Sequence, residues 1–88
     1  MTEYLFVGGP LDGERHGVHK STNRVILLDE FGDVVFYYPD FYHIQHCRMN
    51  ESSFGINAFV VDGHGEEFAH RLGLLANQPA FADLLIPI

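Results

Sequence analysis

The chain has 88 residues, which fits one domain, and we place that domain at residues 1–88. An apolar content of 47%, with eight Phe and four Tyr, supplies a core and argues against disorder. Twelve acidic against five basic residues give a net charge of −7, and no segment is basic, which argues against direct binding to nucleic acid.

Strand-forming residues open the chain at positions 2–7 and lead into Gly8-Gly9-Pro10. Proline fixes its own φ and glycine accepts a positive one, so residues 8–13 predict a tight reversal. Residues 14–20 then return as a second strand. Two strand-like runs, 25–28 and 34–38, flank a glycine-containing turn and predict a β-hairpin whose second strand ends at Pro39.

The second half of the chain changes from strands to helix. Residues 42–49 and 56–61 predict strands separated by a turn at 50–55. From Glu66 the apolar spacing becomes three and four residues, which predicts a helix ending at Asn77, and Pro79 begins a second short helix that turns Phe81 inward. Strands followed by a helix predict an α+β fold, a small antiparallel sheet of about four to six strands with the C-terminal helix packed on one face.

Cysteine usage and hydropathy indicate the compartment. A single cysteine, Cys47, allows no intrachain disulfide, whereas small extracellular domains usually carry several. The N-terminus lacks the basic and apolar pattern of a signal peptide, and no apolar segment approaches the roughly 20 residues that span a bilayer. We therefore expect a cytoplasmic protein with no membrane contact.

Six histidines make a metal site worth testing, and His43, His46 and Cys47 form the densest group. In a strand over residues 42–49, His43 and His46 point to opposite faces, and no Cys-x-x-Cys or His-Glu-x-x-His pattern is present. An acid–base pair at His64 is conceivable, but its segment is more simply a strand-to-helix connection. We predict no metal, no cofactor and no enzymatic activity.

One resemblance stands out. The strand Tyr4-Leu5-Phe6-Val7, followed by Gly8-Gly9-Pro10-Leu11-Asp12-Gly13, resembles the start of many small bacteriophage and prophage proteins of no agreed activity. The likeness covers only this opening segment and carries over no catalytic residue. It implies a phage genome as origin and a bacterial host cytoplasm as workplace.

Acidic residues crowd the predicted hairpin turn, and those of the first turn are expected nearby. An acidic rim suits an arginine-rich groove, although simple solvation explains it equally well. We predict that the partner-binding residues are five acids and two aromatic residues of the hairpin: Asp12, Glu14, Asp29, Glu30, Asp33, Phe36 and Tyr38.

These patterns favour a protein that binds rather than catalyses. The first hypothesis is a small phage accessory protein that binds and inhibits a host protein or complex, for example an antiviral defence system in the manner of anti-CRISPR proteins. The alternative is a virion or assembly protein that self-associates. The apolar end, residues 84–88, is either tucked against the sheet or buried in a partner or second copy, which leaves a homodimer through this tail open.

Overall fold

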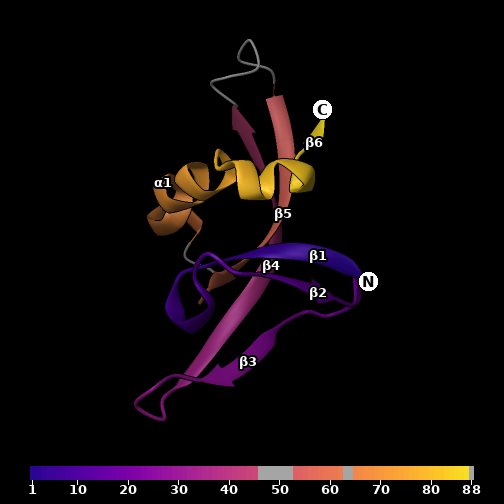
Figure 1. Cartoon of the computed structure of the whole chain (residues 1–88). Helices are drawn as coiled ribbons and strands as arrows, with labels where there is room; N and C mark the ends of the chain where they lie inside the picture. The colour runs from indigo at the N-terminus through magenta and orange to yellow at the C-terminus, as the bar shows by residue number, and fades with distance from the viewer. Residues whose placement is uncertain (46–52, 63–64, 88) are drawn as a thin grey trace.

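The computed structural model describes residues 1–45, 53–62 and 65–87. Figure 1 shows the elements, which follow the order β1 (Thr2–Val7), the 3₁₀ helix η1 (Gly9–Leu11), β2 (Arg15–Val18), β3 (Val25–Leu28), β4 (Val34–Gln45), β5 (Ser53–Val61), α1 (Gly65–Ala76), the 3₁₀ helix η2 (Pro79–Leu84) and β6 (Ile86–Pro87). Strands come first and helices last, so the predicted α+β class is confirmed.

The strands form one sheet in the order β2-β1-β5-β4-β3. The short strand β6 pairs with residues near the start of β5, Phe54 and Gly55. The sheet curls into a half-barrel (Figure 1). Every pairing is antiparallel except β1 with β5, which is parallel and aligns Leu5 with Ala58 and Val7 with Val60. This one parallel pairing makes the sheet mixed. It joins two strands whose paired residues, such as Leu5 and Ala58, are more than half the chain length apart in sequence.

Strand β4 is longer than the sequence suggests. It runs from Val34 through Pro39 to Gln45 as one strand, so the prediction that Pro39 ends a strand was wrong. The amide of Asp62 donates to the carbonyl of Phe36, which fixes the even-numbered residues of β4 as those bonded to β5. The nitrogen of Pro39 therefore points to the other edge, beyond the end of β3, where the missing N–H costs no ladder bond.

Two hydrophobic cores lie on opposite faces of the sheet. On the helix side, the buried residues come from β1, β5, α1 and η2: Leu5, Val7, Ile56, Ala58, Val60, Leu72, Leu75, Ala76 and Phe81. Inside the half-barrel, the core is aromatic: Tyr4, Phe6, Tyr37 and Phe59. The rings of Phe6 and Phe59 stack with centroids 5.1 Å apart. The central strand β5 contributes to both cores.

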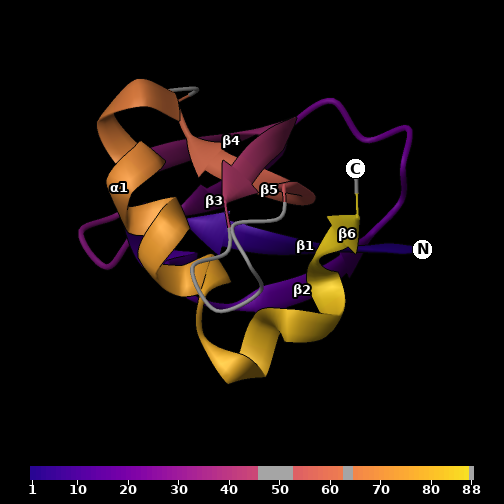
Figure 2. The ribbon, with the colours of Figure 1, turned by 90° about the horizontal axis from the view of Figure 1, so that it is seen from above.

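The C-terminal segment packs along the helix-side core and one end of β5. Figure 2 shows α1 continuing into η2 and then β6. Phe81 is buried, and Leu84 and Leu85 pack against the helix-side core. Ile86 and Pro87 then pair with Gly55 and Phe54 of β5, so this part of the apolar tail lies against the sheet. Ile88 is outside the described residues.

Candidate functional site

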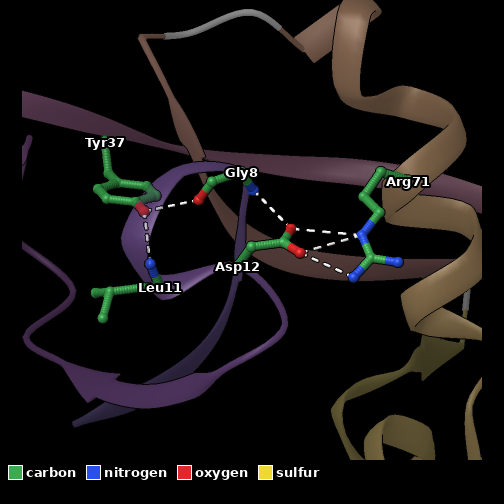
Figure 3. Close-up of polar contacts among 5 residues, drawn as sticks. All are labelled: Gly8, Leu11, Asp12, Tyr37 and Arg71. Carbon is green, nitrogen blue, oxygen red and sulfur yellow. Dashed lines mark hydrogen bonds and ion pairs between the residues drawn. The ribbon is translucent and has the colours of Figure 1, made fainter. Parts of the chain in front are cut away.

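The turn after β1 is held from inside the half-barrel by Tyr37. Its hydroxyl donates to the carbonyl of Gly8 (2.7 Å) and accepts from the amide of Leu11 (3.0 Å), as Figure 3 shows. A Cβ on Gly9, whose φ is +62°, would lie 2.6 Å from the Tyr37 hydroxyl oxygen, so only glycine fits there. Burial raises the pKa of Tyr37, so its hydroxyl keeps the proton that it donates.

Asp12 fastens the same turn to helix α1. Its carboxylate accepts from the amide of Gly8 (2.8 Å) and from Nη2 of Arg71 (2.8 Å) (Figure 3). Partial burial acts to raise the pKa of Asp12, but the bonds from Arg71 and Gly8 outweigh it and hold that pKa below its ordinary value. The turn thus has its polar groups satisfied internally and serves as structure.

A cleft of about 550 Å³ lies between this turn and the hairpin turn that joins β3 to β4. Its lining combines carboxylates with apolar side chains: Gly9, Pro10, Asp29, Glu30, Phe31, Val35, Val61 and Asp62. Phe31, one of the lining residues, is 80% exposed. A pocket with this lining suits a ligand that is cationic at one end and apolar along its length.

The three carboxylates that line the cleft differ in their hydrogen bonding. Asp29 Oδ1 accepts from the amides of Phe31 and Asp33, each at 2.9 Å, and so shapes the turn. The side chains of Glu30 and Asp62 make no hydrogen bond or ion pair with the described part of the chain. Asp62 directly follows β5 and has a φ of +51°, a left-handed backbone that non-glycine residues adopt rarely. Within the described cleft lining, Glu30 and Asp62 are therefore the carboxylates without a polar partner.

The seven residues predicted to bind a partner fall in three places. Asp29 and Glu30 line the cleft, and Asp33 lies on the same turn. Asp12 and Glu14 lie apart from them, with Asp12 paired to Arg71 and Glu14 Oε1 3.0 Å from His16 Nε2. Asp62 was not predicted from the sequence, because its approach to the hairpin turn depends on the register of β4 with β5.

Phe36 and Tyr38 belong to a separate surface. Tyr38 pairs with Val60, so alternate residues of β4 and β3 continue the helix-side face of the sheet beyond the helix. We call this surface the hairpin stripe. Its members are mostly exposed apolar residues: Ile26, Leu28, Val34, Phe36 and Tyr38.

Three of the four described histidines lie in separate local contacts, and the fourth, His70, is exposed on α1. His16 contacts Glu14, His19 Nδ1 lies 2.6 Å from Ser21 Oγ, and His43 meets the ring of Phe41 edge-on. No group of three or more His, Cys, Asp or Glu residues that could hold a metal occurs among the described residues. His46, Cys47 and His64, which the sequence analysis considered, lie outside them.

No helix within residues 1–45, 53–62 and 65–87 is long and apolar enough to cross a membrane. No protein-family model, curated protein or solved structure matches the chain.

Proposed function

We propose that the chain binds a basic surface of another protein through the cleft between the Gly9-Pro10 turn and the hairpin turn. The observation that carries this proposal is a pair of carboxylates, Glu30 and Asp62, that have no polar partner in the described part of the chain and line the cleft with the exposed Phe31. An arginine or lysine of the partner would place its charge between the carboxylates. Its aliphatic stem would lie against Pro10 and Val35.

Electrostatics on the scale of the whole molecule support the same partner. The net charge of −7 attracts a basic surface from a distance and raises the rate of encounter. The aromatic ring of Phe31 adds a face on which a guanidinium can stack, worth about 0.5–1 kcal/mol at an exposed site. The chemistry required of the partner is thus an arginine-containing or lysine-containing protein surface with apolar residues beside it.

The resemblance of the first turn to small phage proteins supplies the biological setting. We infer that the partner is a protein or complex of a bacterial host, that binding inhibits it, and that an antiviral defence system is a fitting target. No catalytic group is required, because covering a functional basic groove is sufficient to block it.

The test compares two variants of equal charge. Glu30→Gln with Asp62→Asn removes both free carboxylates of the cleft, and Asn tolerates the left-handed backbone at position 62. Glu14→Gln with Asp40→Asn removes the same charge away from the cleft. Asp29 is left intact because it shapes the turn.

Wild type and both variants are used as bait in a bacterial lysate, and the captured protein is identified by mass spectrometry and purified. We expect the cleft variant to bind that protein at least about tenfold more weakly than the control variant, with a salt dependence smaller than that of wild type. Equal affinities for the two variants would contradict the assignment of the cleft.

A second candidate is the virion or assembly component that self-associates. The observation in its favour is the hairpin stripe, because contiguous exposed apolar residues mark interaction surfaces. Light scattering separates the two: a large closed ring favours assembly, and a monomer or dimer counts against it.

A further inference from the structure

Strand β3 is a free edge of the sheet. Among the described strands it pairs only with β4, and the strand order places it at one end. The amide of Asp29 donates to the carbonyl of Asp33, which sets the phase of the ladder, so Val25 and Leu27 turn their N–H and C=O groups toward β4. Ile26 and Leu28 turn theirs outward, where the described part of the chain offers them no partner.

The two edges of the sheet differ in how they are protected. The β2 edge carries Gly17 and the charged Arg15, whose guanidinium pairs with Glu3 and Asp83. The β3 edge consists of four aliphatic residues with no charge, proline or bulge, and Ile26 and Leu28 are 53% and 64% exposed. Unprotected apolar edges of this kind are templates for pairing with another strand.

The sequence of the β3 edge is complementary to itself. If two antiparallel copies meet with a two-fold axis at Leu27, Ile26 of each copy lies opposite Leu28 of the other. The same register brings Arg24, which precedes β3, beside the hairpin turn that carries Glu30 of the second copy, and this contact between opposite charges occurs twice. Within the described residues, Arg24 has only the ring of Phe36, 5.5 Å from its guanidinium carbon, and Glu30 has no polar partner.

We propose that a second copy of this chain occupies the β3 edge and forms a two-fold dimer with one sheet running through both copies. Each of the two Ile26–Leu28 pairs exchanges two backbone hydrogen bonds, and their side chains lie side by side on the hairpin stripe. The contact is isologous and uses the β3 edge of both copies, so assembly stops at two. Because Glu30 also lines the cleft, dimerisation competes with partner binding there.

A pairing of so few residues buries less surface than a standard interface of about 1,600 Å², so the dimer is weak and depends on concentration. Sedimentation velocity of the whole chain, from roughly 10 μM to 1 mM, measures it. Salt at roughly 0.15 M screens the repulsion between two acidic copies. We expect the weight-average mass of wild type to rise toward twice that of the monomer across this range.

Charge variants identify the surface. Arg24→Glu alone and Glu30→Arg alone each place like charges opposite one another, so we expect each to associate at least about tenfold more weakly than wild type. A one-to-one mixture of the two variants restores both ion pairs, and we expect a mixed dimer of near wild-type affinity. Lys20→Glu, which changes the net charge as Arg24→Glu does, should dimerise like wild type.

A wild type that stays monomeric at all concentrations would overturn the proposal. So would a dimer unaffected by either charge variant, which would place the contact elsewhere, for instance at the apolar tail, or a mixture that fails to restore association. Circular dichroism of each variant verifies that it is folded. The measurement contains no partner protein, so its outcome leaves the proposed function to its own test.

Discussion

At the scale of single residues, acids that look alike in the sequence do different work. The carboxylates of Asp12 and Asp29 both make structural hydrogen bonds. Asp12 accepts from the amide of Gly8 and the guanidinium of Arg71, and Asp29 accepts from two amides of its own turn. Glu30 and Asp62 have no polar side-chain partner among the described residues. A predicted acidic surface therefore divides into carboxylates that stabilise turns and carboxylates that make no such contact.

Asp12 makes stability depend on pH in a defined direction. Its pKa is lowered in the folded state, so its contribution is fully present above its unfolded pKa of about 3.9 and is lost as the pH falls through the lower folded value. We expect Asp12→Asn to be less stable than wild type at pH 7 by about 0.5 kcal/mol, because the Arg71 pair is partly exposed. Well below pH 4 this difference should shrink toward zero.

Urea unfolding followed by circular dichroism at pH 7 and near pH 2.5 measures both differences. Asp33→Asn is the control, since the Asp33 side chain has no partner in the described ranges. An Asp12→Asn effect of equal size at both pH values would argue against the ion pair as its cause. Asp83, whose pKa is lowered by its bond to Arg15, retains its own acid dependence in every variant.

At the scale of elements, the long β4–β5 ribbon contains a close contact between an aromatic ring and a glycine. Phe41 pairs with Asn57, and its ring extends diagonally over Gly55, filling the space that a Cβ would take. A ring covering a strand glycine shields backbone that would otherwise be exposed and keeps the two strands in register.

Gly55→Ala tests this contact. The new methyl group meets the ring of Phe41, so we expect a loss of about 2 kcal/mol in the free energy of unfolding. Combining it with Phe41→Ala removes the clash, and the double variant should be more stable than additivity of the two single variants predicts. Chemical denaturation of the four proteins completes the cycle, and additive losses would show that ring and methyl do not meet.

The elements also show what a sequence can and cannot predict here. The β3–β4 hairpin, the turn after β1 and the start of η2 at Pro79 were predicted because their signals are local. The passage of β4 through Pro39 was not, because it depends on which edge the proline nitrogen faces. Of the cleft, Asp29 and Glu30 were found from their crowding, whereas Asp62 joins them only through tertiary pairing. The alternation of side chains along a strand would have placed Phe36 and Tyr38 on one face of the sheet and Val35 and Tyr37 on the other.

At the scale of the whole molecule, the first and last described strands contribute unequally to the stability of the fold. Strand β1 lies inside the sheet between β2 and β5 and supplies residues to both cores. Strand β6 has two residues, both exposed, and pairs with only one end of β5.

Truncation at the two ends should therefore give opposite results. A chain lacking residues 86–88 should keep a cooperative thermal transition, shifted by only a few degrees. A chain lacking residues 1–7 should not fold. Removing Leu5, Phe6 and Val7 takes fully buried side chains out of both cores and leaves large cavities there. Circular dichroism with thermal melting checks both, and a cooperative transition in the chain without residues 1–7 would contradict the central place given to β1.

Because β5 separates the two cores, its alignment is fixed from both sides. Phe59 and Val60 are neighbours in sequence, yet Phe59 fills the aromatic interior and Val60 fills the helix side. Sliding β5 by a single position would exchange these two sets of side chains and spoil both interiors together. The parallel register with β1, which no tight turn sets, is thus specified by the packing of side chains on both faces of the sheet.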